Sequence, residues 1–287
     1  MNEILRRRLL EAPRDDYRAN DPVRCAHGYD DPRDREVVAL LSALLAFGKV
    51  AAFLPKVEAL LERLGPHPRR AVEEFQPHRN LEFYERFRVR LWTGEDIRYL
   101  LLNLQGMFER FDTLEDAFLS GARGGRTHRE RLAAFARRFY LASPAAITGS
   151  GRIPSYYHML VVDPSRGSAS KRWNLFLRWV VRPADGVDLG LWTRVSPRDL
   201  VAPLDVHVGR ISGLIGLRRR RTLDWRAAEE VTAALQALDP DDPLRFDLPL
   251  SHIGISEGCR ARYVPRICGA CSIRKLCRVY RASRSAR

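Results

Sequence analysis

The sequence predicts an all-α fold, and three observations carry this prediction. Apolar residues recur with the period of about 3.6 residues that an amphipathic helix requires, and strict alternation of apolar and polar residues is scarce. Glycine, proline and capping residues stand between the periodic stretches. No internal repeat or low-complexity segment interrupts the pattern. At 287 residues the chain is long enough for one large domain or for two lobes.

The first predicted core helix covers residues 37–47. Residues 1–34, which precede it, are polar and contain three prolines, so they predict a short helix followed by an irregular segment. Asp34 stands where it can cap the core helix, whose apolar residues nearly surround its axis, as in a helix buried on all sides. Residues 50–64 continue with one apolar face and end at a Gly-Pro pair.

The middle of the chain predicts further helices joined by loops. An aromatic and basic stretch, 83–92, leads into a helix that begins after Thr93, a residue type suited to capping, and has acids in its first turn. Shorter helices are expected at 114–119 and 132–140. The glycine- and arginine-rich stretch 121–126 between them predicts a linker, and residues 144–154 predict a loop.

The charge of the chain points to a polyanionic partner. Lysine and arginine total 49 against 35 acids, a formal charge of +14, which favours nucleic acid or an acidic membrane surface over an inert basic exterior. The longest apolar runs, such as 37–47, are about half the length that spans a bilayer. The first residues lack the apolar core of a signal peptide, so we expect a cytoplasmic protein without a membrane segment.

Four of the five cysteines form a cluster near the C-terminus, with the spacing C-x8-C-x2-C-x5-C. In a reducing compartment such a cluster is typical of a metal site rather than of disulfides. Four thiolates suit either an iron–sulfur cluster or a structural zinc ion, and the spacing leaves both open. The ligands would be Cys259, Cys268, Cys271 and Cys277, with basic residues on every side of them.

A turn of small residues, Gly167-Ser168-Ala169-Ser170, leads directly into a helix that begins near Lys171. The free N–H groups and the dipole of a helix start form a phosphate-sized anion site. The dipole also disfavours the charged form of a lysine there, and a deprotonated lysine is a nucleophile. The alternative is an ordinary solvated lysine, although the apolar helix 173–181 that follows favours a rigid, drier setting.

Asp205 is an isolated acid within an apolar run, at or near the start of a second buried helix. It can serve as an N-cap that accepts the backbone N–H of His207 or Val208. Capping and catalysis do not compete, because a capping carboxylate stays ionised and can still face a cleft. His207 suits a structural or phosphate-contacting role better than that of a general base.

In chain order these three features resemble the helix–hairpin–helix DNA glycosylase superfamily, whose members include endonuclease III. There a hairpin L-P-G-V-G-x-K-T-A precedes V-D-T-H-V-x-R, and the iron–sulfur branch adds C-x6-C-x2-C-x5-C. Here the hairpin reads G-S-A-S-K at 167–171, and the acid motif reads L-D-V-H-V-G-R at 204–210. Bacterial relatives in that superfamily carry a similar lysine segment, G-S-A-x-K-R-x-N-x-F-L-R-W. The resemblance covers roughly residues 30–280.

The resemblance implies a two-lobed helix–hairpin–helix glycosylase fold with a C-terminal iron–sulfur loop. Residues 1–34 would be an extension packed on the second lobe, and 35–155 a lobe of the six-helix type. Residues 156–258 would hold the helix–hairpin–helix catalytic segment and the helices after it. Residues 259–287 would form the cluster loop and a basic tail.

The resemblance also implies excision of a damaged base from double-stranded DNA. Lys171 would attack the anomeric carbon and form a Schiff base that permits strand cleavage, with Asp205 as acid/base or charge stabiliser. The residues expected to contact DNA are Gly167, Ser168, Ala169, Ser170, Arg172, His207 and Arg210. An aromatic wall for the flipped base would come from among Trp92, Tyr156, Tyr157, Trp173 and Trp192.

Two departures from the family pattern bear on the substrate. Ala169 replaces the second hairpin glycine, and an insertion around 182–197 lengthens the gap between Lys171 and Asp205. A similarly long gap occurs in archaeal 8-oxoguanine glycosylases, whereas the four-cysteine loop belongs to the endonuclease III branch. We therefore expect an oxidised purine, 8-oxoguanine first, and an oxidised pyrimidine second.

The expected assembly is a monomer associated with the nucleoid and carrying a [4Fe-4S] cluster, with structural zinc as the alternative cofactor. A non-catalytic iron–sulfur protein that only binds DNA is the competing interpretation. A zinc protein that binds RNA is a third. The presence of both Lys171 and Asp205 in matching contexts favours the enzyme.

Overall fold

A computed structural model describes residues 2–10, 21–120, 127–143, 151–255 and 257–285. The described residues are mostly helical, as the sequence predicts. The predicted linker 121–126 and most of the predicted loop 144–154 lie outside them. Among the described residues, no helix is both long enough and apolar enough to cross a membrane.

The first half of the chain contains eight α-helices, one 3₁₀ helix and one small hairpin in its described parts. They are α1 (Asn2–Leu10), the 3₁₀ helix η1 (Pro22–Gly28), α2 (Pro32–Leu45), α3 (Val50–Leu64), α4 (Pro68–Glu73), α5 (Leu81–Arg86), β1 (Arg88–Val89), β2 (Trp92–Thr93), α6 (Gly94–Phe108), α7 (Leu114–Leu119) and α8 (His128–Tyr140). β1 and β2 pair antiparallel, Arg88 with Thr93 and Val89 with Trp92.

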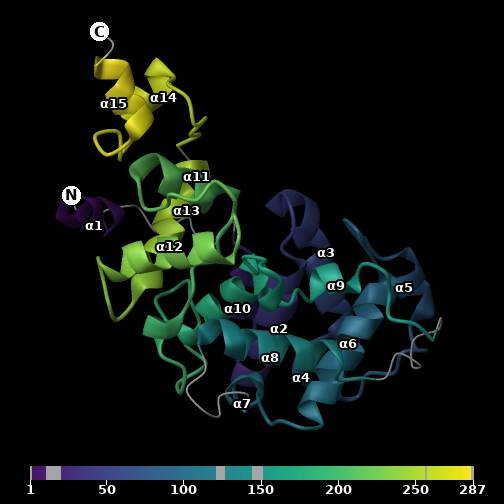
Figure 1. Cartoon of the computed structure of the whole chain (residues 1–287). Coiled ribbons are helices and arrows are strands. Elements are labelled where there is room, and N and C mark those ends of the chain that lie inside the picture. Colours follow the sequence, from purple (N-terminus) through teal and green to yellow (C-terminus); the bar gives the residue numbers. More distant parts are fainter. Residues whose placement is uncertain (1, 11–20, 121–126, 144–150, 256, 286–287) are drawn as a thin grey trace.

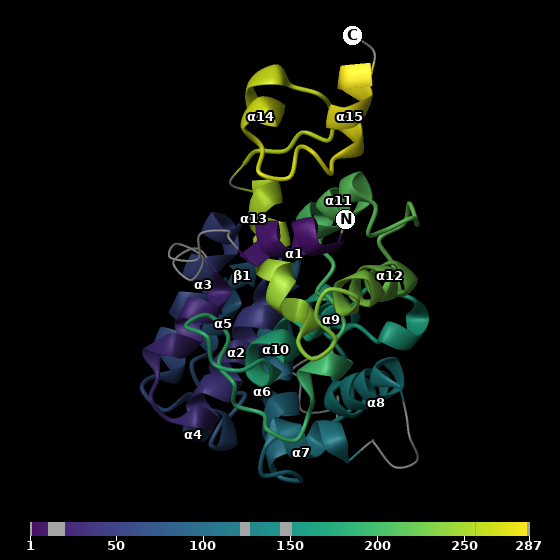
Figure 2. The same cartoon turned by 90° about the vertical axis from the view of Figure 1, so that its left-hand side faces the viewer.

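The second half adds α9 (Tyr157–Leu160), η3 (Pro164–Arg166), α10 (Lys171–Val181), η4 (Pro197–Asp199), α11 (Val206–Ile215), α12 (Trp225–Gln236), η5 (Pro243–Phe246), α13 (Asp247–Ile255), α14 (Pro265–Ala270) and α15 (Arg278–Ser285). In Figures 1 and 2, α14 and α15 stand together at one end of the molecule, beyond α11 and α13. α1 packs against α13 and buries Leu5 and Leu9. The N-terminal helix therefore lies beside elements from the other end of the chain.

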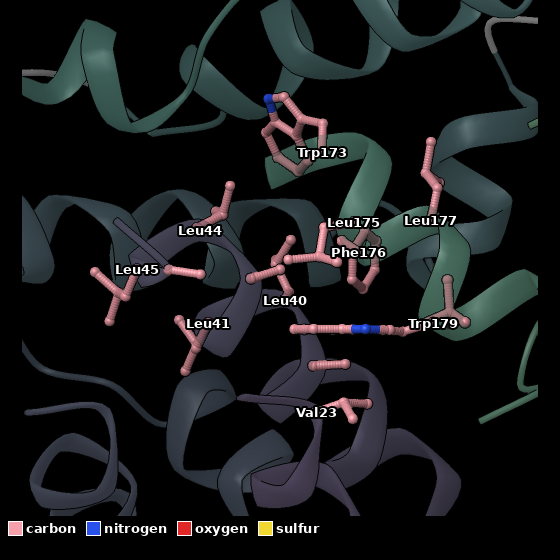
Figure 3. Close-up of a cluster of buried hydrophobic side chains, with 14 of the residues drawn as sticks. Val23, Leu40, Leu41, Leu44, Leu45, Trp173, Leu175, Phe176, Leu177 and Trp179 are labelled. Atoms are coloured by element: carbon pink, nitrogen blue, oxygen red, sulfur yellow. The ribbon is translucent and has the colours of Figure 1, made fainter. Parts of the chain in front are cut away.

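The core lies between α2 and α10, which pack directly on each other. Figure 3 shows Leu40 of α2 beside Leu175 and Phe176 of α10. Every residue of α2 from Val37 to Leu45 is buried, as the all-round apolar pattern predicts. Because α10 begins at Lys171, this packing anchors the helix that carries the predicted nucleophile.

The start of α2 corrects one prediction. Asp31, and not Asp34, is the N-cap: its side chain accepts a hydrogen bond from the Arg33 amide, and Pro32 occupies the first helical position. Asp34 lies inside the helix, 4% exposed, and accepts the Arg69 amide at 2.7 Å. Three aspartates, Asp30, Asp31 and Asp34, stand within five residues around the start of the helix, and local sequence does not distinguish which one caps it.

The start of α6 confirms the predicted cap. Thr93 and Asp96 form a reciprocal capping box, in which the Thr93 amide donates to the Asp96 carboxylate at 2.7 Å. Gly94 follows because the chain passes very close to α5 here: a Cβ atom at this position would lie 1.7 Å from the Tyr84 carbonyl oxygen. Only glycine fits between the two segments.

Candidate active site

The predicted small-residue turn lies immediately before α10, as expected. Gly167 ends η3 with φ of 89°, and Ser170 precedes α10 with φ of 45°, so both adopt left-handed backbone conformations. The Ser168 hydroxyl accepts a hydrogen bond from the Ser170 amide at 3.1 Å. The Gly167 carbonyl accepts the Trp225 amide at 2.9 Å, which ties the turn to the start of α12. These bonds make Lys171 the first residue of the helix.

Asp205 caps α11 with one carboxylate oxygen. Its Oδ1 accepts the backbone N–H groups of His207 and Val208, each at 2.8 Å. Its Oδ2 lies 3.6 Å from the Lys171 Nζ. The two predicted residues, 34 positions apart in the sequence, are therefore an ion pair. Asp205 caps α11 as predicted, and its catalytic role stays a prediction.

The setting of this pair suits proton transfer. The Lys171 side chain is 37% exposed and that of Asp205 18%, so solvent and a ligand can reach the amine. The carboxylate is within reach of the protons on Nζ and can accept one. Because α10 and α11 both begin here, the positive ends of two helix dipoles converge at the site and favour an approaching anion.

Three predicted DNA contacts have partners inside the protein. Arg172 donates to the carbonyls of Leu44, at 2.6 Å, and Met159, and its guanidinium carbon lies 4.7 Å from the centre of the Trp92 ring. Burial lowers the pKa of Arg172 to about 10. The side chain is therefore directed into the fold at the end of α2 rather than outward.

His207 and Arg210 likewise face the protein. The Arg210 Nη2 lies 3.0 Å from the His207 Nδ1 and donates to the Gly254 carbonyl at 3.2 Å. Both side chains therefore join α11 to α13. Of the residues predicted to contact DNA, Ser168 is exposed and Gly167 half-buried, whereas Ala169 and Ser170 are buried.

A cavity of about 620 Å³ lies beside the first turn of α10. Arg172 lines it, but Lys171 and Asp205 do not. Trp92, one of the predicted wall aromatics, belongs to the lining, whereas the rest of the lining was not predicted from the sequence. The other aromatic and apolar lining residues include Phe47, Tyr140, Leu141, Met159 and Val161.

The remaining predicted wall aromatics do not line this cavity. Tyr157, Trp173 and Trp192 are core residues with at most 3% exposure. Trp192 donates to the Glu36 carboxylate at 2.6 Å, and burial raises the pKa of that glutamate to about 6. Tyr156 is 49% exposed on the surface.

A buried ion cluster behind the pair was missed by sequence reasoning. Arg178 of α10 bridges Asp188, at 3.1 Å, and Asp247 of α13, at 2.8 Å. Burial raises the pKa of Asp247 to about 6; Arg178 opposes that rise, whereas nearby Asp205 and Asp188 add to it. Burial also raises the pKa of Asp21. The available signal was a single arginine within the apolar run 173–181.

Most of the chain, including the residues of the site, matches a known protein family. A model for the family DUF2400, whose description is "protein of unknown function", matches residues 21–256. The chain belongs to the DUF2400 family. The matched range includes the turn, Lys171 and Asp205, and it ends before the first clustered cysteine. The searches of curated proteins and of solved structures gave no match.

In this DUF2400 chain Cys259 lies in the loop before α14, Cys268 within α14, Cys271 directly after it, and Cys277 directly before α15. All five cysteines are free, half-buried thiols. Within the described ranges, no three His, Cys, Asp or Glu side chains are gathered closely enough to hold a metal ion. Burial raises the pKa of the Cys271 thiol to about 12, and nearby Glu257 and Cys259 add to the rise. Four free thiols in one short module nonetheless fit a thiolate-bound centre by their donor chemistry.

Proposed function

We propose that this DUF2400 protein is a DNA glycosylase with associated AP lyase activity, built on the two-lobed helix–hairpin–helix glycosylase fold. Its substrate is a damaged base in duplex DNA, with 8-oxoguanine as first choice. The observation that carries the proposal is the half-exposed Lys171–Asp205 pair at 3.6 Å, at the point where two helices begin. An amine nucleophile, a proton acceptor and an anion-favouring field then act at one place.

The reaction uses these two residues in sequence. Asp205 accepts a proton from Lys171, and the neutral amine attacks C1′ of the damaged nucleotide. The Nζ–C1′ bond forms as the glycosidic bond breaks, and the base leaves with the bonding electrons and takes up a proton. The sugar ring opens to a Schiff base, and loss of a C2′ proton expels the 3′ phosphate. The alternative role for Asp205 is to stay ionised and stabilise positive charge on the sugar.

The damaged base must leave the helix to be reached. The cavity of about 620 Å³ beside α10 has aromatic and apolar walls, and its volume lies in the range usual for ligand sites. We assign it as the candidate base pocket. Phe47 is its stacking candidate, because it belongs to the lining and is 39% exposed, whereas Trp92 also lines the cavity but is only 1% exposed.

The four clustered cysteines are proposed to hold a [4Fe-4S] cluster, with zinc as the alternative. Cys259, Cys268, Cys271 and Cys277 would be the ligands. The centre would stabilise the C-terminal module, which carries a basic surface suited to DNA phosphates. Anaerobically purified protein should be brown with broad absorbance near 400 nm if the centre is iron–sulfur, and colourless if it is zinc.

The decisive experiment is borohydride trapping on a panel of duplexes carrying oxidised purines and oxidised pyrimidines. The chain has only four lysines, Lys49, Lys56, Lys171 and Lys275, so the adduct can be assigned cleanly. We expect a trapped adduct with wild type, none with Lys171→Gln, and an unchanged yield with Lys56→Gln, whose side chain is exposed on α3.

Other outcomes would change the assignment. Base release without a trapped adduct would replace the lysine mechanism by water activated by Asp205. Binding that weakens steeply with salt, but releases no base from any lesion, would make the protein a non-catalytic DNA binder. Preference within the panel separates an oxidised purine from an oxidised pyrimidine as the substrate.

A further inference from the structure

The turn that presents Lys171 holds a conformation that costs free energy. Ser170 is 4% exposed and has φ of 45° and ψ of 42°, in the left-handed region. A residue with a Cβ atom is sterically disfavoured there, and such strain persists only where the surroundings hold it. Glycine would adopt the same conformation freely. Contacts with the surrounding structure must therefore keep Ser170 in this conformation.

The holding group is the side chain of Asn174. Its Nδ2 donates to the Ala169 carbonyl at 3.0 Å, directly before Ser170, and its backbone N–H donates to the Ser170 carbonyl at 3.1 Å. Asn174 is 1% exposed, so water does not compete for these bonds. One residue of α10 thus bonds the peptide groups on both sides of Ser170.

His128 fixes the orientation of that amide. Its Nε2 lies 3.3 Å from the Asn174 Oδ1. Because Asn174 uses its nitrogen as the donor to Ala169, its oxygen must accept, and His128 must carry its proton on Nε2. Burial lowers the pKa of His128 to about 4, so the ring is neutral near pH 7.

The histidine comes from a different part of the fold. His128 is the first residue of α8, and its ring stacks on Trp225 with 6.2 Å between ring centres. Trp225 also donates its backbone N–H to the Gly167 carbonyl, at the other end of the turn. Side chains of α8, α10 and α12 therefore enclose the turn.

We propose that Asn174 and His128 form a positioning pair, which holds the 167–170 turn so that the Lys171 amine is aimed at Asp205. Neither residue touches substrate; both act through the turn. The catalytic consequence rests on the proposed function, whereas the effect on the Lys171 amine itself does not.

The kinetic test uses a rescue that a merely structural role would not permit. Asn174→Ala should lower the single-turnover rate of adduct formation by about 10–100-fold with little change in DNA affinity, because a misplaced nucleophile loses rate. Adding Ser170→Gly removes the need to hold a strained residue and should restore a large part of that rate.

Asn103 provides a matched control. It is a buried asparagine whose Nδ2 donates to the Tyr99 carbonyl at 2.8 Å, and whose Oδ1 accepts the Ser143 amide, far from the turn in sequence. Asn103→Ala removes a comparable bond, so at equal folded fraction its rate should match wild type. A loss in Asn103→Ala equal to that in Asn174→Ala, or no rescue by Ser170→Gly, would overturn the proposal.

A second measurement needs no DNA. Reductive methylation with ¹³C-formaldehyde labels the lysines, and the small number of lysines makes the Lys171 NMR signal easy to assign. The signal should move in Asn174→Ala, return toward its wild-type position with Ser170→Gly added, and stay in place in Asn103→Ala. If wild type traps no DNA but the signal behaves in this way, the repair proposal fails and the positioning pair stands.

His128→Leu extends the test to a variant that leaves the start of α10 intact. It should move the same NMR signal by a smaller amount, because Asn174 keeps its bond to Ala169 but loses the partner that orients it. An unmoved signal in both His128→Leu and any folded Asn174 variant would overturn the proposal.

Discussion

The helix α10 carries two cation–acid groups in contrasting surroundings. At its first residue, Lys171 faces Asp205 at 3.6 Å, with 37% and 18% of the side chains exposed. Seven residues later, about 10 Å along the axis, Arg178 contacts Asp188 and Asp247 with all three side chains at most 4% exposed. The same helix thus begins with the partly exposed amine of Lys171 and carries the buried guanidinium of Arg178 two turns later.

The difference in exposure suits the two groups to different roles: the accessible pair to chemistry and the buried cluster to holding the fold together. A buried ion pair has lost its hydration, so breaking it leaves an uncompensated charge in a poorly polarisable setting. A half-exposed pair contributes little to stability, but its amine is accessible and has a carboxylate in place to take its proton. The buried cluster fixes α10, and the exposed end carries the proposed chemistry.

The largest expected effect is on activity at the exposed end. Lys171→Gln should abolish the borohydride-trapped adduct, because no other amine occupies this position. The same variant should change the free energy of unfolding by less than about 0.5 kcal/mol, since the ion pair is exposed to solvent. Trapping gels and urea unfolding of one preparation measure both quantities. A trapped adduct in the variant would assign the nucleophile elsewhere.

The next effect is on stability at the buried end. Arg178→Met should cost about 3–5 kcal/mol, because it leaves the buried Asp247 without its cation, whereas Asp188 keeps its ion pair with Arg182. The control is Arg70→Met, which breaks a 2.9 Å pair with Glu74 on the surface and should cost about 0–1 kcal/mol. Equal costs in urea unfolding would mean that burial does not distinguish the two kinds of pair.

The pH dependence of the buried cluster gives a third prediction. Burial raises the pKa of Asp247 from 3.8 to about 6, so between these values the folded chain holds a proton that the unfolded chain has lost. The contribution of this group to stability therefore falls as pH rises through that window. Asp247→Asn lacks the titration, so its stability relative to wild type should rise by up to about 3 kcal/mol from pH 4 to pH 7.

Denaturant unfolding of both proteins at several pH values measures this difference. Asp241→Asn, at an aspartate whose side chain is 84% exposed, is the control and should follow wild type at every pH. A difference between Asp247→Asn and wild type that does not change with pH would contradict the prediction.

The smallest effect separates the two oxygens of Asp205. Asp205→Ala removes the cap of α11 and should cost about 1 kcal/mol, whereas Asp205→Asn keeps an oxygen for the His207 and Val208 amides and should cost less. Both should lose activity alike, because neither can accept a proton from Lys171. Activity retained in Asp205→Asn would reduce the role of this carboxylate to capping.

Local signals in the sequence predicted much of the site. The turn before Lys171 and the helix start at Asp205 follow from residues within a few positions of each other, and the structure places both as expected. That the two meet across 34 residues came from the family resemblance, since spacing alone does not bring two helix starts together.

Side-chain directions set by distant partners were not predictable. Arg172 was assigned to DNA because it follows the turn, but its orientation depends on the carbonyls of Leu44 and Met159, which the sequence does not place beside it. The buried ion pair of Arg178 was not predicted from the apolar helix around it, because its partner Asp247 lies 69 positions away in the sequence. Such contacts exist only once the helices have packed.

The two carboxylate oxygens of Asp205 have different partners: Oδ1 caps α11, and Oδ2 faces the Lys171 amine. Oδ1 holds the start of α11, so the acid cannot swing away from the amine without fraying that helix, and its orientation persists from one turnover to the next. Most substitutions of this acid would therefore lower the stability of the fold as well as the proposed activity. Asparagine is the exception, and a well-folded relative that carries it at this position should bind its target without acting on it.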